Sequence, residues 1–147
     1  MNHSNKKPRK SPIKINSSGT STFSKKKNLI VLKKDVVITQ EDLRLESDEA
    51  KIYIRQENGE EVVDRAVLNG GVHVSKFDSD ESKMVKARGD KATFFNQRQV
   101  VELDGHARLW KGGHLIKGKK IIYDLKSGMI SVDEARGVVQ PGELKND

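Results

Sequence analysis

The 147-residue sequence predicts an all-β fold of short antiparallel strands, and three observations support this expectation. Apolar and polar residues alternate along much of the chain, which is the period of a strand with one buried face. The unit that carries this alternation recurs four times along the chain. No segment of helix length places apolar residues at a period of 3.6. We therefore expect a stack of strands whose inner faces share one apolar lining.

The four copies of the unit start at Ser18, Ser47, Gly89 and Gly118, so successive starts lie 29, 42 and 29 residues apart. Each copy contains two alternating segments of strand length. The longer middle interval contains a seven-residue insertion around "QENGEE" and a second insertion around "FDSDES". Because both insertions are polar and rich in turn-forming residues, we expect them to form loops.

Two sets of short polar sequences are predicted to be turns. "KKKN", "ENGEE", "NQRQ" and "KSG" should join the two strands within a copy. "KKD", "NGG", "DG" and "DE" should separate one strand pair from the next, and "NGG" and "DG" contain residues that tolerate positive φ. The glycine-rich, basic "KGGHLIKGKK" lacks the residue order of a phosphate-binding loop and is interpreted as a hairpin connection.

The inward positions can be read from the repeat. Counted from each copy start, positions 3, 5, 12, 14, 18 and 20 are mostly apolar. Leu32, Leu68, Leu103 and Val132 are equivalent residues of the four second strands and should point to the same side. If the inner faces press together, the lining is a plain core; if the sheet folds only part-way, it is a groove for an apolar ligand. The small and medium side chains by themselves favour a plain core.

The charge of the chain is concentrated at its amino-terminal end. The formal net charge is +7, but residues 1–27 hold eight basic residues and no acidic one. The remainder then has 28 − 8 = 20 basic against 21 acidic residues, so it is nearly neutral. We expect a disordered basic leader over residues 1–12, a β domain over 13–141 and a tail over 142–147. No apolar run follows the leader, so neither a signal peptide nor a membrane span is expected in this sequence.

Few residues are arranged for chemistry. The chain has no cysteine, which excludes a disulfide, a thiolate metal site and a thiol nucleophile. The four histidines lack the spacing of metal ligands, and Asp90 and Glu102 are expected to be exposed. We therefore expect no catalytic residues, no metal site and no cofactor. Lysines 111, 117, 119 and 120 cluster near Trp110, either to meet a phosphorylated sugar or only to keep the β protein soluble and its edges unpaired.

The segment from Ala87 to Val139 carries a more specific pattern. It has Gly-Asp-x-Ala-x-aromatic at Gly89 to Phe94, Leu-x-Gly at Leu103 to Gly105, and Arg-x-Trp with Gly-Gly at Arg108 to Gly113. Ile-x-Gly-x-x-Ile-x-Tyr-Asp follows at Ile116 to Asp124, and then a turn with Gly128. In this order and spacing the chain resembles the LptA/OstA-like family of periplasmic lipopolysaccharide transport proteins. The resemblance covers about Ile13 to Pro141, with "DVVITQEDLRLESDEAKIYI" similar to the first half of the family pattern.

The resemblance implies a fold, a function and partners. The fold would be the OstA-type incompletely closed β-jellyroll, a V-shaped sheet of short antiparallel strands. The protein would bind the lipid A acyl chains of lipopolysaccharide and carry them across the periplasm, from inner to outer membrane, as part of the Lpt bridge. Its partners would be an LptC-like clamp protein, an LptD-like translocon and further copies of the chain, joined by edge-strand pairing. The residues implied to bind lipid are Phe23, Ile30, Leu32, Val36, Ile38, Ile52, Leu68, Val72, Phe94, Val101, Leu103, Leu109, Ile121 and Tyr123.

Two other classes of function remain open from the sequence. A β-solenoid polymer of the bactofilin type also has short repeats and a basic tail, although units of 29 residues with insertions fit hairpins better than regular coils. Nucleic-acid binding through the basic leader is weakened by the nearly neutral body and the scarcity of aromatic residues on the polar face. Within the family, the absence of an amino-terminal membrane helix and of a large barrel after Pro141 favours the soluble bridge protein.

Overall fold

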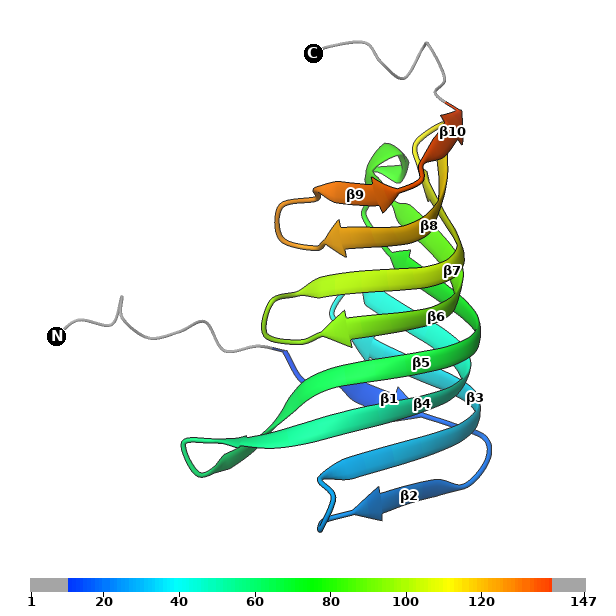
Figure 1. Cartoon of the computed structure of the whole chain (residues 1–147). Helices are drawn as coiled ribbons and strands as arrows, with labels where there is room; N and C mark the ends of the chain where they lie inside the picture. The colour runs from blue at the N-terminus through cyan, green and yellow to red at the C-terminus, as the bar shows by residue number, and fades with distance from the viewer. Residues whose placement is uncertain (1–10, 139–147) are drawn as a thin grey trace, which may run out of the picture.

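The computed structural model describes residues 11–138, which form a single ten-stranded antiparallel sheet (Figure 1). The strands pair in the order β1-β3-β4-β5-β6-β7-β8-β10, while β2 also pairs with β3 and β9 with β8. Most of the expected leader and all of the expected tail lie outside the described residues. Within residues 11–138 no helix is long and apolar enough to cross a membrane. The strands are β1 (Lys14–Asn16), β2 (Ser21–Ser24), β3 (Leu29–Gln40), β4 (Leu43–Glu57), β5 (Glu60–Lys76), β6 (Val85–Phe95), β7 (Val100–Lys111), β8 (His114–Asp124), β9 (Ile130–Asp133) and β10 (Arg136–Val138).

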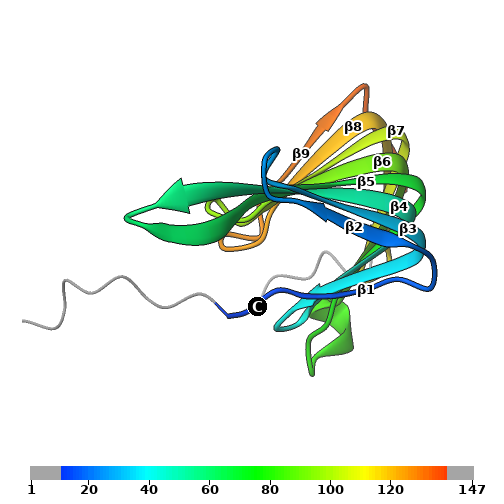
Figure 2. The same ribbon diagram turned by 90° about the horizontal axis from the view of Figure 1, so that it is seen from below.

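The sheet bends along one line, which we term the corner. At the corner the register of each central strand pair shifts, for example between Lys33 and Val36 on β3 and between Asp104 and Ala107 on β7. Figure 2 shows the ribbon turning there, so that the sheet is an open fold with two halves at an angle. The first leg holds β2, β9 and residues 29–33, 49–57, 60–69, 91–95, 100–104 and 120–124; the second leg holds β1, β10 and residues 36–40, 43–47, 72–76, 85–88, 107–111 and 114–118.

Paired residues in the left-handed region produce the bend on alternate strands. They are Lys34 and Asp35 on β3 (φ 68° and 49°), Gly70 and Gly71 on β5 (86° and 51°), and Gly105 and His106 on β7 (80° and 50°). Two such residues in succession interrupt the pleat and form a bulge, which redirects the strand.

The prediction that "KKD", "NGG" and "DG" are turns that separate one strand pair from the next is therefore wrong. These sequences lie inside continuous strands, because the backbone preference that makes a residue suitable for a turn also makes it suitable for a bulge. The connections between copies are instead the tight turns at residues 41–42 and 112–113 and the loop at 77–84. "KGGH" is the hairpin connection that we expected, and "DE" lies at the end of β9, with Glu134 in the turn before β10.

The four turns predicted within copies are confirmed. The "FDSDES" insertion is also a loop, with one short 3-10 helix, η2 (Glu81–Lys83). The "QENGEE" insertion differs from the expected loop, because β4 and β5 continue through it and only Asn58 and Gly59 form the turn. The insertion therefore lengthens this hairpin, which projects beyond its neighbours (Figures 1 and 2).

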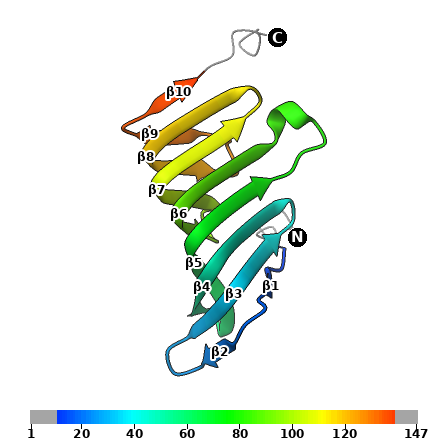
Figure 3. The same cartoon turned by 90° about the vertical axis from the view of Figure 1, so that its right-hand side faces the viewer.

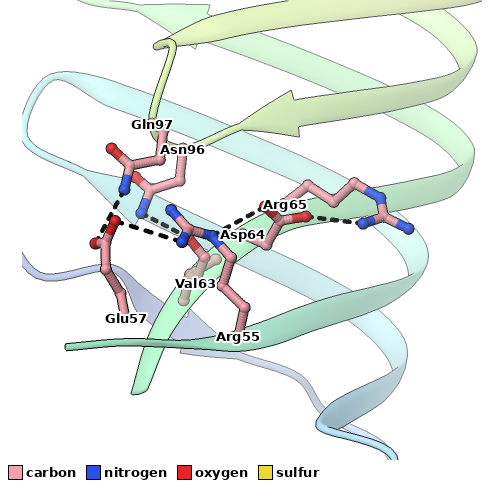
Figure 4. Close-up of polar contacts among 7 residues, drawn as sticks. All are labelled: Arg55, Glu57, Val63, Asp64, Arg65, Asn96 and Gln97. Atoms are coloured by element: carbon pink, nitrogen blue, oxygen red, sulfur yellow. Dashed lines mark hydrogen bonds and ion pairs between the residues drawn. The ribbon is translucent and has the colours of Figure 1, made fainter. Parts of the chain in front are cut away.

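Polar contacts hold the long β4–β5 hairpin to the neighbouring β6–β7 turn (Figure 4). The Asn96 side-chain amide donates to the Val63 carbonyl at 3.0 Å, and the Gln97 amide donates to the Glu57 carboxylate at 3.3 Å. Ion pairs along the hairpin accompany them, at Arg55–Glu57, Arg55–Asp64 and Arg65–Asp64. Since these charged groups are part-exposed, each pair contributes little on its own, and the network mainly fixes the orientation of the hairpin.

The apolar residues of the repeat meet in straight ladders across the sheet. One ladder is Leu32, Ala50, Leu68, Ala92, Leu103, Ile121 and Val132, each directly opposite the next on the neighbouring strand. This register confirms that Leu32, Leu68, Leu103 and Val132 face the same side. From Leu32 to Leu103, leucine and alanine alternate along the ladder, so the two legs can approach and interdigitate there.

Candidate functional site

The candidate site is the inner face of the bent sheet. Twelve of the fourteen residues predicted to line it are buried in one apolar cluster: Leu32, Val36, Ile38, Ile52, Leu68, Val72, Phe94, Val101, Leu103, Leu109, Ile121 and Tyr123. Ile30 is partly buried and packs against this cluster, whereas Phe23 is 54% exposed on the end strand β2. All fourteen therefore belong to the strands that build the interior, and in this structure the legs bury most of them against each other.

Four further lining residues do not follow from the repeat alignment. Leu43, Leu45, Val85 and Ala87 are each at most 3% exposed and lie on the second leg at the starts of β4 and β6. They fell between the copies, in segments that we expected to separate one unit from the next. Their own alternation, "LRL" and "VKA", is the sequence signal that identifies them as strands.

A polar cluster, which we term the clasp, joins the two legs where the strands end. Gln40, at the end of β3 on the second leg, is only 7% exposed. Its amide donates to the Ser11 carbonyl at 2.9 Å and to the Asn96 side-chain oxygen at 3.3 Å. Gln99, from the β6–β7 turn of the first leg, donates to the Gln40 side-chain oxygen at 3.1 Å. The two hydrogen bonds with Asn96 and Gln99 join the second leg to the first, so they form only while the legs are together.

A second polar group lies beside the core. Lys76 at the end of β5 contacts Asp42 at 3.0 Å, and this hydrogen bond raises the pKa of Lys76. Burial raises the pKa of the Tyr123 phenol, and the positive charge of Lys76 partly opposes that shift. Tyr123 therefore stays neutral at the edge of the lining, where an ionised phenol would be poorly solvated.

The interior offers an apolar surface rather than reactive groups. Among the described residues, the buried side chains are aliphatic or aromatic apart from Gln40, Ser47 and the Tyr123 hydroxyl, and none carries a formal charge at neutral pH. Histidines 73 and 106 are exposed, as expected, and His106 contacts Asp90 at 2.8 Å outside the lining. Such a surface can bind by burial of apolar area and by dispersion contacts.

Both ends of the sheet are open. The short strands β1 and β2 form one end and β9 and β10 the other, so each end has a backbone edge without a partner strand among residues 11–138. Apolar side chains are exposed near both, with Ile15 and Phe23 at one end and Met129, 67% exposed, at the other. An unpaired edge beside exposed apolar residues is suited to continuation of the sheet by another strand.

The geometry defines a class: an open, V-shaped antiparallel sheet with an apolar interior and free edges at both ends. Comparison with known families specifies it further. The family described as LptA/(LptD N-terminal domain) LPS transport protein matches residues 14–129, and the chain belongs to this family. Its function is lipopolysaccharide transport. This confirms the resemblance and the expected OstA-type, incompletely closed jellyroll, in a family of transport proteins rather than enzymes.

A solved structure has the same fold. The crystal structure of LptH from Pseudomonas aeruginosa, described as the LptA-homologous periplasmic component of the conserved lipopolysaccharide transport device, matches with a TM-score of 0.79. The match covers 89% of this chain and 96% of LptH at 19% sequence identity. No curated protein matches the chain significantly in sequence. The bactofilin-type alternative is not supported, because consecutive strands pair antiparallel in one open sheet instead of coiling as a solenoid.

Proposed function

We propose that the protein binds the acyl chains of lipopolysaccharide between its two legs and carries the lipid across the periplasm, from the inner to the outer membrane. The observation that supports this most strongly is the continuous apolar inner face, which runs from β3 to β9 between the two open edges. The lipid-contacting residues would be the fourteen predicted ones, from Phe23 on β2 to Tyr123 on β8. The periplasmic description of LptH, which shares the fold, supports the location.

Lipid entry would exchange one set of apolar contacts for another. The lining residues of the two legs now bury each other, and an inserted acyl chain would replace leg–leg contacts with leg–lipid contacts of similar kind. The chain itself leaves water and gains about 0.8 kcal/mol for each buried CH₂. The main cost is breaking the clasp at Gln40, whose hydrogen bonds each contribute about 1 kcal/mol. The balance therefore favours loading by a lipid with long acyl chains.

The partners would join at the edges. An LptC-like clamp protein at one end and an LptD-like translocon at the other would each add strands to the sheet, and further copies of this chain could extend the bridge between them. The three- and four-residue end strands support this proposal, because they leave backbone groups unpaired at both ends. Exposed Phe23 and Met129 would then be covered by the neighbour.

Photo-crosslinking tests the lipid proposal. A photoreactive phenylalanine analogue placed at Phe94 or Leu103 should label purified lipopolysaccharide, because both side chains face the interior. The same analogue at Thr93 or Glu102, one residue away and on the outer face, is the matched control and should label weakly. A third interior site, Phe23, is exposed and tolerates the bulky group if the core sites do not. Equal labelling from both faces, or labelling from the outer face alone, would contradict the proposal.

A further inference from the structure

The outer face of the sheet carries two ladders of charged residues. In one the signs of the charges largely alternate, and the other contains a run of four cations. On the first leg, Lys33, Glu49, Asn69, Lys91, Asp104, Lys120 and Asp133 lie opposite one another in register. Positive and negative charges largely alternate along this ladder. Lys33 contacts Glu49 at 3.4 Å, and Lys120 contacts Asp104 at 3.8 Å. This is the arrangement expected of an outer face that serves only solubility, since opposite charges face each other.

On the second leg, directly past the corner, the corresponding ladder passes through Val37, Glu46 and His73 and then becomes a run of four cations. Arg88 on β6 lies opposite Arg108 on β7, Arg108 lies opposite Lys117 on β8, and Lys117 lies opposite Arg136 on β10. We term these four residues the cationic ladder. All four side chains are exposed. Within residues 11–138 none of them forms an ion pair with an acidic side chain.

A depression in the surface accompanies the cationic ladder. Arg108, Lys117 and Arg136 line an open cavity of about 450 Å³, together with His106 and Lys119 at the corner. Figure 3 shows β7, β8 and β10 side by side at this end of the sheet. Glu134 is the acidic residue in the cavity wall, and it lies 4.0 Å from Lys119. The cavity is therefore strongly positive, and it opens on the side of the sheet opposite the apolar interior.

Like charges directly opposite each other on neighbouring strands destabilise a sheet. Their side chains begin about 5 Å apart, so an anion placed between them would contact several cations at once. Arginine donates paired hydrogen bonds in a planar fork that matches two phosphate oxygens, and lysine adds a point charge. A phosphate group therefore satisfies this surface better than a monovalent counter-ion.

We propose that the cationic ladder and its cavity form a binding site for a phosphate group, on the outer face and separate from the lipid-binding interior. Arg108, Lys117 and Arg136 hold the phosphate, and Arg88 extends the positive field along the sheet. The phosphate could belong to the phosphorylated sugar of a glycolipid or be a free ion, and both share this chemistry. The inference stands independently of acyl-chain binding, because no interior residue takes part in it.

The structure also divides the lysine cluster that the sequence places near Trp110. Lys120 belongs to the alternating ladder, where Glu102 at 3.5 Å and Asp104 already partner it. Lys117 belongs to the cationic ladder, and Lys119 lies at the corner between the two. Of the four clustered lysines, the structure thus assigns Lys117 and Lys119 to the phosphate site.

The test is a titration of the full chain by two-dimensional NMR at low ionic strength. Three probes are compared: inorganic phosphate, glucosamine 1-phosphate and glucosamine. We expect saturable shifts at the amides of Arg108, Lys117 and Gly118 with both phosphates and none with glucosamine. Tighter binding of glucosamine 1-phosphate would identify a sugar-phosphate site, and equal binding a site for free phosphate. Both outcomes support the proposal.

Paired variants separate a built site from general positive charge. Arg108→Gln with Lys117→Gln should weaken phosphate binding at least about tenfold, because it removes two charge-assisted contacts. The matched control, Lys91→Gln with Lys120→Gln, removes the same charge from the alternating ladder and should change binding less than about twofold. Equal weakening in both double variants, or shifts that never saturate, would overturn the proposal. So would tight binding of a single-stranded oligonucleotide together with no saturable binding of either phosphate.

Discussion

At the scale of single residues, position 118 on β8 has no room for a side chain larger than the hydrogen atom of glycine. A Cβ built there would collide with Val132 Cγ1 and would lie 2.8 Å from the Asp133 carbonyl oxygen. The first obstacle is a side chain that could move, but the second is backbone of the adjacent strand β9. Gly118 therefore allows β9 to follow β8 up to the corner.

Gly118→Ala should destabilise the protein by about 1–3 kcal/mol, because the added methyl forces β9 away from β8. Urea unfolding of the purified protein measures the change. Adding Val132→Ala removes one of the two collisions, so the double variant should lose less stability than the sum of the single variants. A Gly118→Ala protein that unfolds at the wild-type urea concentration would show that β9 moves aside without cost.

Tyr123 makes the protein sensitive to alkali. Burial raises the pKa of its phenol above the ordinary value of 10.0, so the folded state disfavours the ionised form. A group whose pKa is raised on folding contributes stability that is fully present below its unfolded pKa and is lost as the pH rises through the folded value. The raised pKa of Lys76, held by Asp42, acts in the same direction.

We therefore expect the free energy of unfolding to fall above about pH 10. Denaturant unfolding between pH 8 and pH 11 provides the measurement. Tyr123→Phe should remove part of this fall, while Tyr53→Phe, a change on the outer face, should leave it unchanged. A Tyr123→Phe protein whose stability falls as steeply as the wild type would rule out this assignment.

At the scale of elements, the corner and the clasp have opposite effects on the two legs. The corner is covalent and repeated, with paired left-handed residues on β3, β5 and β7. The clasp is a small group of hydrogen bonds at the far ends of the strands. The legs are consequently joined by continuous backbone at the corner, and at the opposite ends of the strands by hydrogen bonds that contribute about 1 kcal/mol each.

Weakening the clasp should open the interior. Gln40→Ala removes the buried amide that both Asn96 and Gln99 contact, and we expect a loss of about 1–2 kcal/mol in stability. The fluorescence of an apolar dye such as ANS should increase, because the inner face becomes reachable. Gln56→Ala, on the exposed outer end of β4, is the control. Unchanged dye binding in Gln40→Ala would mean that the apolar contacts alone hold the legs together.

At the scale of the whole molecule, strands that are neighbours in the sheet are mostly consecutive along the chain. Apart from the end strands, every strand pairs with those before and after it in the chain, and in the described part of the chain no strand crosses over to close the sheet. The central strands β4 to β7 are 11 to 17 residues long and have a neighbour on both sides, whereas β1, β2, β9 and β10 have three or four residues each. Stability should therefore decrease from the centre towards both ends.

Amide hydrogen exchange should reveal this gradient. We expect the amides of β5 and β6 to exchange most slowly and those of β1, β2, β9 and β10 to exchange fastest, because the end strands open without disturbing the centre. A partner strand added to one edge should slow exchange at that end only. Uniform protection across all ten strands would indicate a fully cooperative sheet instead.

The repeat and the alternation were sufficient to predict the strands and their common inner face. Leu32, Leu68, Leu103 and Val132 were placed on one side from spacing alone, and the structure confirms this. The same reasoning places Gly70 and Gly105 in turns between strand pairs, whereas both lie inside continuous strands. It also missed Leu43 and Val85, because they lie between the copies, outside the positions that the repeat aligns.

What the sequence by itself determined is local: the period of the strands, the side that is apolar and the residues able to adopt positive φ. These follow from side-chain chemistry and backbone sterics within a few residues. Only the tertiary structure decided that the positive-φ pairs bend a continuous sheet, that Gln40 meets Gln99 across 59 residues, and that four cations align on separate strands. Each of these depends on the register between strands, which distant hydrogen bonds and packing set together.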